Sequence, residues 1–351
     1  MTLTDLGLPM PTRPLTVGMP ADGPLLDTYG RVATDLRVSL TDRCNLRCTY
    51  CMPAEGLDWL PDNQLLDADE LARLLRIAVT RLGITSVRFT GGEPLVNQNL
   101  ERAIAAAAAL RPRPDIAVTT NGLGLAKRAA RLKQAGLNRV NVSLDTVNAE
   151  HFAHITRRDR LADVLAGLAA AAEAGLGPIK VNAVLEPRTG LDDVVPLLRF
   201  CLEHGYQLRI IEQMPLDAGH EWTRAKTIDA HVVLSTLRRH FDLRPDPAPR
   251  GSAPAQLWRV DGSAGTVGVI ASVSESFCGA CDRTRLTADG QMRSCLFSAT
   301  ETDLRALLRG GADDDTVEAA WRRAMWAKPA GHGINDPSFT QPVRPMSAIG
   351  G

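Results

Sequence analysis

The sequence predicts an α/β fold: an incomplete TIM-type barrel of six strand-then-helix units, (βα)6, followed by a C-terminal α+β extension. Two observations support this. Short apolar runs alternate with longer stretches of helical periodicity as far as about residue 215, and this rhythm implies a parallel sheet with right-handed crossovers. The unusual polar motifs come directly after apolar runs, where the strands of such a barrel place its active site.

The strand and helix units can be located in order along the chain. The expected strands cover 36–40, 86–89, 116–119, 139–144, 179–185 and 208–212, and helical patterns lie between them near 67–82, 98–110, 125–135, 161–174 and 191–204. Three polar motifs follow strands, namely Thr90-Gly91-Gly92-Glu93-Pro94, Thr119-Thr120-Asn121-Gly122 and Ser143-Leu144-Asp145. Each could be a simple turn, but their shared position favours one functional rim.

The rhythm changes in the C-terminal third. A stretch rich in Pro, Arg and Gly at 242–254 indicates a linker or surface loop. Strands are expected at 256–260 and 265–271, a hairpin at 284–287 and 291–294, and helices near 300–308 and 313–326. We therefore expect a poorly ordered N-terminal extension over 1–25, a partial barrel over 26–240 and a C-terminal region over 241–351.

Composition excludes several classes of function. With 351 residues and 44% hydrophobic content, the chain can bury a large core. Lys+Arg and Asp+Glu both number 40, which argues against a protein that coats nucleic acid or binds a membrane surface. We find neither a secretory signal nor an apolar stretch near the roughly 18 residues that a membrane span needs. The expected location is therefore cytoplasmic, where the 7 cysteines favour metal ligation over disulfides.

The first cysteine motif supplies three thiolates. Cys44, Cys48 and Cys51 have C-x3-C-x2-C spacing. A tetrahedral zinc ion or a four-iron cluster takes four ligands, so three thiolates leave one position open. In a cluster, a small molecule can bind the free iron, whereas a zinc knuckle would need a distant fourth ligand. The spacing alone leaves both interpretations open.

The second cysteine motif repeats this shortage of ligands. Cys278, Cys281 and Cys295 have C-x2-C-x13-C spacing, and the histidines closest in sequence are His240 and His332. Zinc with a histidine ligand remains an alternative, but a second cluster with an open iron explains the missing ligand better. Such an iron could bind a nitrogen or oxygen of a substrate. Cys201 belongs to neither group, and we assign it no function.

Basic residues near the second motif indicate an anionic substrate. Arg283 and Arg285 are two residues apart on an expected strand, so their side chains share a face and can clamp phosphate oxygens. The alternative is a solvated charged strand. Lys180 lies in an apolar strand and needs an anionic partner if it is buried.

Together these motifs resemble a known family. The first cysteine run, with Tyr50 before its last cysteine, and the Gly91-Gly92-Glu93-Pro94 turn resemble the radical S-adenosylmethionine (SAM) enzymes. Segments 35–48 and 88–94, the second cysteine motif and the last two residues, Gly350-Gly351, narrow the resemblance to the GTP 3′,8-cyclase family. It extends from about residue 25 to the last residue. It implies two [4Fe-4S] clusters, held by the two cysteine triads, with SAM on the open iron of the first.

The resemblance also implies the roles of individual residues. Tyr50, Gly92, Ser143 and Met214 would contact SAM, and the glycine tail of Gly350 and Gly351 would enter the active site. The GTP contacts would be Arg37, Arg88, Thr119, Lys180, Arg283, Thr284 and Arg285.

The implied reaction is the first step of molybdenum cofactor biosynthesis, catalysed by a lyase. A 5′-deoxyadenosyl radical would take hydrogen from ribose C3′ of GTP, and the ribose carbon would then attack C8 of guanine. The expected partners are a flavodoxin- or ferredoxin-type electron donor and, downstream, cyclic pyranopterin monophosphate synthase, with a homodimer left open. Two alternatives are a radical enzyme acting on a peptide or another small molecule, and a zinc-binding scaffold or nucleic-acid module.

Overall fold

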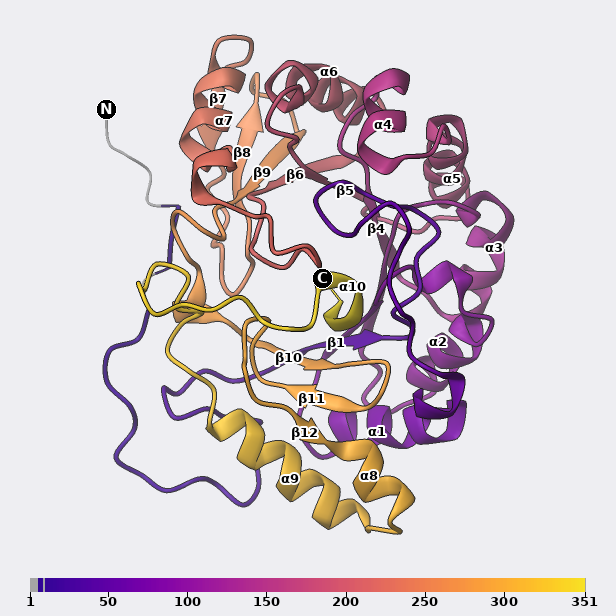
Figure 1. Cartoon of the computed structure of the whole chain (residues 1–351), viewed down its shortest axis with the longest axis vertical. Helices are drawn as coiled ribbons and strands as arrows, with labels where there is room; N and C mark the ends of the chain where they lie inside the picture. The colour runs from indigo at the N-terminus through magenta and orange to yellow at the C-terminus, as the bar shows by residue number, and fades with distance from the viewer. Residues whose placement is uncertain (1–5, 9, 351) are drawn as a thin grey trace.

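The computed structural model describes residues 6–8 and 10–350. Its centre is a curved parallel sheet of six neighbouring strands, with the helices on the outside of the arc (Figure 1). The strands are β1 (Asp35–Ser39), β2 (Ser86–Thr90), β3 (Asp115–Thr120), β4 (Arg139–Ser143), β5 (Lys180–Val184) and β6 (Gln207–Ile211). They pair in chain order and in parallel. This confirms the predicted fold class.

The connecting helices have the expected amphipathic pattern and pack their apolar faces on the sheet. They are α1 (Ala68–Thr80), α2 (Leu100–Ala108), α3 (Leu125–Ala135), α4 (Ala149–Thr156), α5 (Leu161–Glu173), α6 (Gly190–Glu203) and α7 (Ala230–Arg238). The sequence analysis did not identify α4 and α7. Short 3-10 turns are η1 (Asp62–Gln64), η2 (Pro94–Val96), η3 (Arg224–Lys226) and η4 (Cys278–Ala280).

The C-terminal strands extend both edges of the barrel sheet. They are β7 (Leu243–Pro245), β8 (Gln256–Val260), β9 (Thr266–Ile270), β10 (Arg283–Leu286), β11 (Gln291–Arg293) and β12 (Thr302–Asp303). β9 pairs in parallel with β6, and β10 pairs in parallel with β1. Within the described residues the strands thus form one 12-stranded sheet. The predicted boundary at 240/241 stays a prediction, and the sheet runs through both regions.

The remaining helices are α8 (Leu304–Arg309), α9 (Asp314–Trp326) and α10 (Met346–Ile349). The first two flank β10–β12, while α10 lies inside the arc of strands (Figure 1). Ile349 is fully buried there, and Ser39 Oγ of β1 donates to its carbonyl oxygen at 2.7 Å. The tail therefore closes part of the open barrel from within.

Residues near the N-terminus contact the loop of the second cysteine motif. The Leu8 amide donates to the Ser276 carbonyl at 2.9 Å, and the Gly279 amide donates to the Leu8 carbonyl at 3.1 Å. The Leu6 side chain is 2% exposed. Part of the predicted N-terminal extension thus packs on the C-terminal region. Across the part of the chain that the structure describes, no helix is long and apolar enough to cross a membrane.

Candidate functional site

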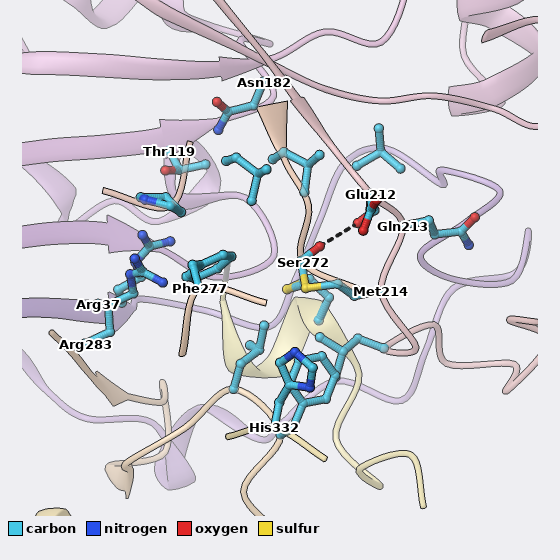
Figure 2. A pocket seen from close by; sticks show the side chains of 18 of the residues that line it. Arg37, Thr119, Asn182, Glu212, Gln213, Met214, Ser272, Phe277, Arg283 and His332 are labelled. Atoms are coloured by element: carbon cyan, nitrogen blue, oxygen red, sulfur yellow. Dashed lines mark hydrogen bonds between the residues drawn. The ribbon is translucent and has the colours of Figure 1, made fainter. Parts of the chain in front are cut away.

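A pocket opens inside the curved sheet and at the carboxyl ends of its strands (Figure 2). It is lined by residues from the barrel strands, from the loop after β9, from β10 and from the C-terminal tail. Twelve of the predicted site residues line it: Arg37, Tyr50, Cys51, Arg88, Thr119, Ser143, Met214, Cys278, Cys281, Arg283, Arg285 and Cys295. The fold therefore brings Cys51 of the first motif, all three cysteines of the second and five of the seven predicted nucleotide contacts to one cavity, while their individual roles stay predictions. Cys44 and Cys48 do not line it.

The first cysteine triad lies at one side of this pocket as free thiols. Burial raises the pKa of Cys51 to about 12, and the neighbouring charge of Cys44 adds to this effect. Burial, the Asp145 carboxylate and the neighbouring thiols likewise raise the pKa of Cys48 well above its usual value. Three converging thiols that resist ionisation need a cationic centre to hold them as thiolates. The donor set fits an iron cluster.

The glycine turn after β2 supports the loop of this triad. A Cβ on Gly91 would lie 2.2 Å from the Thr41 carbonyl oxygen, and one on Gly92 would lie 2.3 Å from the Asp42 carbonyl oxygen. The Gly92 amide donates to the Thr41 carbonyl at 2.8 Å. Glycine is therefore required here because the cysteine loop itself approaches the turn. Gly92 is not among the residues lining the pocket.

Glu93 connects this turn to the next strand. Its buried carboxylate accepts from Thr120 Oγ1 at 2.7 Å and from the Asn121 amide at 2.6 Å. Burial raises its pKa to about 7. The Asn121 side chain reaches Cys44 Sγ at 3.8 Å. Two of the predicted polar motifs thus position the first cysteine loop.

The second cysteine triad has a different electrostatic environment. Burial and the charge of Cys295 raise the pKa of Cys278. Burial would also raise the pKa of Cys281, but the charges of Lys328 and Arg283 outweigh it and hold this pKa at about 7. Lys328 Nζ lies 3.3 Å from Cys281 Sγ. Cationic neighbours favour a thiolate, the form that ligates iron.

The arrangement does not fit a single bound metal ion. In the described chain, no group of three or more His, Cys, Asp or Glu side chains is placed to hold one ion. Cluster ligands bind different iron atoms and are spaced further apart than ligands of one ion. His332, one of the two histidines considered for zinc, does line the pocket beside Cys278. His240 does not line it.

The arginines form the most unusual part of the site. Arg37, Arg88, Arg209 and Arg283 each have a buried Nε atom without a hydrogen-bond partner among the described residues. Burial and the charge of Arg37 lower the pKa of Arg88 well below its usual value. Burial lowers the pKa of Arg285 to about 9, with Arg37 and Arg283 adding to the effect. Crowded, unsatisfied guanidinium groups need an anion.

Two carboxylates, Asp35 and Asp282, oppose this charge. Burial would raise the pKa of Asp35, but the charges of Arg37 and Arg88 lower it overall. Its Oδ2 atom lies 3.5 Å from Arg37 Nη2 and 4.0 Å from Arg283 Nε. Asp282 Oδ1 lies 3.9 Å from Arg283 Nε. Two carboxylates cannot neutralise Arg37, Arg88, Arg209, Arg283 and Arg285. The surplus positive charge faces the pocket.

Lys180 and Thr284 do not line the pocket. Burial lowers the pKa of Lys180 to about 7, and the charges of Arg209 and Arg139 add to this. The fully buried Thr284 accepts at Oγ1 from Trp321 Nε1 at 3.1 Å. Strand alternation explains this, because Arg283 and Arg285 face the pocket and the residue between them faces α9. The structure thus gives no support to a GTP contact by the Thr284 hydroxyl.

The C-terminal tail contacts the predicted site residues. Arg285 Nη1 donates to the Gly350 carbonyl oxygen, so this arginine holds the tail. The Ser347 backbone forms a hydrogen bond with Cys51, and the Met346 amide donates to the Leu216 carbonyl at 2.9 Å. The structure places Gly350 beside Ser39 of β1 and Thr90 of β2, and Gly351 lies outside the described residues, so the entry of this tail into the active site stays a prediction.

The predicted SAM contacts lie near the first triad. Tyr50 donates from its hydroxyl to Asp145 Oδ2 at 2.8 Å, and the Val184 amide donates to Asp145 Oδ1 at 2.8 Å. Burial raises the pKa of Asp145 to about 6. Ser143 and Met214 line the same pocket. This carboxylate fixes the aromatic side chain beside Cys51.

Sequence reasoning missed several residues that line the pocket. Arg209 on β6 is the most important, because burial lowers its pKa to about 10 and its Nε is unpartnered within the described chain. Its signal was available: an arginine in an apolar strand, the same pattern that identified Lys180. Asn141 on β4 and Asn182 on β5 also line the pocket. A lone asparagine in a strand gives no comparable signal.

Comparison with known proteins agrees with this geometry. The family model described as Radical SAM superfamily matches residues 38–201, and the model Molybdenum Cofactor Synthesis C matches residues 206–334. A protein of Mycobacterium sp. (strain KMS) named GTP 3′,8-cyclase is 75% identical over 351 residues, covering 100% of both chains. The chain belongs to the GTP 3′,8-cyclase family.

Further relatives carry the same family name. A GTP 3′,8-cyclase of Mycolicibacterium smegmatis is 74% identical, and GTP 3′,8-cyclase 2 of Mycobacterium tuberculosis (strain H37Rv) is 70% identical, each with 100% of both chains covered. Among solved structures, Streptococcus suis SuiB bound to S-adenosylmethionine matches with a TM-score of 0.56 at 14% identity. The match covers 87% of this chain and 66% of that one. At this identity it shows the fold alone.

Proposed function

We propose that the pocket described above carries out the reaction of the GTP 3′,8-cyclase family. This is the conversion of GTP to (8S)-3′,8-cyclo-7,8-dihydroguanosine 5′-triphosphate, the first step of molybdenum cofactor biosynthesis. The observation that carries the proposal is one cavity lined by cysteines of both triads and by arginines whose Nε atoms have no partner among the described residues. Neither a peptide-modifying enzyme nor a zinc scaffold needs such a surplus of buried positive charge.

The cofactors are two [4Fe-4S] clusters and SAM. Cys44, Cys48 and Cys51 would hold the first cluster, and Tyr50, Gly92, Ser143 and Met214 would surround SAM. When bound, this cluster and SAM supply a carbon-centred radical able to remove hydrogen from C3′ of the GTP ribose. Cys278, Cys281 and Cys295 would hold the second cluster at the other part of the pocket.

The chain's own task is to hold GTP in one pose. Arg37, Arg88, Arg209 and Arg283 present guanidinium groups that suit triphosphate oxygens. The lowered pKa values of Arg37, Arg88 and Arg209, together with the unpartnered Nε atoms of all four arginines among the described residues, mean that the group is organised for an anion before it arrives. Lys180 lies among them, and Thr119 lines the pocket. Fixing the ribose in one orientation accounts for much of what a protein contributes to such a reaction.

The tail and the N-terminal residues would limit access of water and oxygen. Gly350, held by Arg285, lies where two strands of the barrel approach each other. We propose that Gly350 and Gly351 act in turnover from this position. The backbone freedom of glycine suits a tail that must fit between strands.

The partners remain further proposals. An electron must reach the first cluster from outside the chain, and a flavodoxin- or ferredoxin-type donor would supply it. A downstream enzyme, cyclic pyranopterin monophosphate synthase, would use the product. Cytoplasmic location agrees with oxygen-sensitive clusters and unpaired cysteines. A homodimer stays a prediction that no contact described here addresses.

Anaerobic reconstitution with iron and sulfide, followed by incubation with GTP, SAM and a chemical reductant, tests the proposal. We expect 5′-deoxyadenosine and a cyclised GTP product in equal amounts. SAM cleavage without a GTP-derived product would refute the substrate. Absence of 5′-deoxyadenosine from protein with full iron content at both triads would refute the reaction class.

A further inference from the structure

The His332 side chain is a pocket residue that the reaction scheme above does not use. Its ring lines the cavity, and its buried Nε2 atom makes no hydrogen bond of good geometry among the described residues, although the Ser272 backbone lies close enough to act on the ring. In Figure 2 it lies at the lower end of the pocket, apart from Arg37 and Arg283. An unsatisfied buried polar atom in a binding pocket indicates a missing ligand atom.

Neighbouring groups hold the ring in place. The Ile334 amide donates to His332 Nδ1 at 3.1 Å. The Phe297 ring lies 5.6 Å away, centroid to centroid, at an interplanar angle of 63°. The His332 backbone also forms a hydrogen bond with Cys278. The ring is therefore fixed beside the second cysteine triad.

These contacts determine what Nε2 can do. Because Nδ1 accepts a hydrogen bond, the hydrogen of the neutral ring is on Nε2. Nε2 is then a donor and has no free lone pair for a metal. Ligation of iron or zinc by Nε2 would put a hydrogen on Nδ1, facing the Ile334 N–H group. The geometry thus argues against His332 as the fourth ligand of the second triad.

The position of the ring indicates which part of a nucleotide it would meet. The phosphates belong with the arginines, which lie apart from His332 in the pocket (Figure 2). The Ile334 amide donates to Nδ1 of the ring, so a neutral donor, the Nε2–H group, faces the cavity here. The neutral part of GTP is its base. A guanine presents O6 as an acceptor where adenine presents an amino donor.

We propose that His332 is a specificity-determining residue whose Nε2–H group donates to the O6 carbonyl of guanine. The proposal rests on GTP binding in this pocket. Adenine would place its amino group against the Nε2–H group, donor against donor. A site that hydrogen-bonds a substrate group rejects an analogue lacking the matching atom, because its own buried group is then left unpaired.

Equilibrium dialysis without oxygen on the cluster-loaded protein tests this, since it needs no turnover. The ligands are GTP, ITP and the triphosphate of 2,6-diaminopurine riboside. The diaminopurine replaces O6 of guanine by an amino group and, as a consequence, lacks the N1 hydrogen, while ITP keeps O6 and N1–H and lacks the 2-amino group. His332→Phe keeps a planar ring and removes the donor, and His332→Gln keeps a donor. His204→Phe is the matched control, because that ring packs on Phe200 and Tyr206 outside the pocket.

We expect His332→Phe to weaken GTP binding by about tenfold or more, the usual effect of removing one partner of a buried hydrogen bond. Its affinity for the diaminopurine analogue should stay unchanged or improve, so discrimination at position 6 disappears. His332→Gln should keep part of that discrimination. The ratio of GTP to ITP affinity should be the same in the wild type, His332→Phe and His204→Phe.

Three results would overturn the inference. One is equal GTP affinity in the wild type and His332→Phe. Another is an equal loss for GTP and the diaminopurine analogue. The third is a changed EPR signal of the second cluster in nucleotide-free His332→Phe with unchanged discrimination, which would place the donor on the cluster. If the wild type itself does not bind GTP, the proposed function fails instead.

Discussion

Substituting Gly350 with alanine should release the C-terminal tail from the barrel. Gly350 has φ +82° and ψ 132°, a backbone conformation that L side chains rarely adopt. An added Cβ would lie 2.4 Å from Ser39 Oγ and 2.6 Å from Thr90 Cγ2. Ser39 and Thr90 belong to paired central strands, which cannot move apart at low cost. The tail must move instead.

The size of the effect follows from these two penalties. A residue forced into a conformation favoured only by glycine costs about 1–3 kcal/mol, and overpacking a tight site costs about 1–3 kcal/mol more. Even the lower sum, about 2 kcal/mol, reduces the docked population roughly 30-fold. The tail is held by contacts of Met346 and Ser347 with Leu216 and Cys51, and of Ile349 and Gly350 with Ser39 and Arg285, none of which belongs to the hydrogen bonding of the sheet. It can therefore leave without unfolding the barrel.

The assay compares product formation, iron content and thermal stability. Gly350→Ala should lose at least tenfold in formation of the GTP-derived product while both clusters remain loaded. Gly311→Ala is the control, because Gly311 has φ +79°, open space around its Cβ position and no place in the pocket lining. Turnover of Gly350→Ala at the wild-type rate would refute the reasoning, as would an equal loss in both variants.

Three further predictions concern the basic residues of the site. Arg209→Met should raise the Kd for GTP about 10–100-fold, as for a lost charged hydrogen bond, with little change for guanosine in the same dialysis experiment; an equal change for both would contradict a phosphate contact. The pKa of Lys180 is about 7, and a bound triphosphate would raise it. GTP affinity should therefore fall as pH rises above about 7, with proton uptake in calorimetry that is lost in Lys180→Met; equal uptake in both would count against this role. Lys328→Met removes a positive charge 3.3 Å from Cys281 Sγ, which favours the more negative reduced cluster, so the reduction potential of the second cluster should fall in an EPR-monitored titration and recover in Lys328→Arg. An unchanged potential in Lys328→Met would exclude this effect.

Much of the barrel was predictable because its signals are local. Strands β1–β6 were expected from apolar runs of a length typical of buried parallel strands. The pairing of Arg283 and Arg285 on one face followed from the two-residue period of a strand, and the structure shows both at the pocket. The same two-residue period implies that the Thr284 side chain points away from the pocket, although the family resemblance suggested a GTP contact at this residue.

Other features depend on contacts between distant parts of the chain. The parallel pairing of β10 with β1 joins strands about 250 residues apart, and nothing in either strand specifies the other. The contact between Leu8 and Gly279 joins the two ends in the same way. Periodicity describes how one element faces its environment, and it carries no information about which other element supplies that environment.

The surroundings of the second triad illustrate this limit. Cys278 and Cys281 lie in one short loop, yet two of the groups that affect their ionisation, Lys328 and His332, come from a distant part of the chain. In the sequence, Lys328 is one scarce lysine and His332 one distant histidine, each consistent with a surface position. Only the folded structure places the Lys328 ammonium group beside the Cys281 thiol and the fixed imidazole of His332 beside Cys278. Cysteine spacing thus identifies the cluster ligands in the sequence. The residues that surround the open iron, and so determine what can bind it, can be identified only in the folded structure.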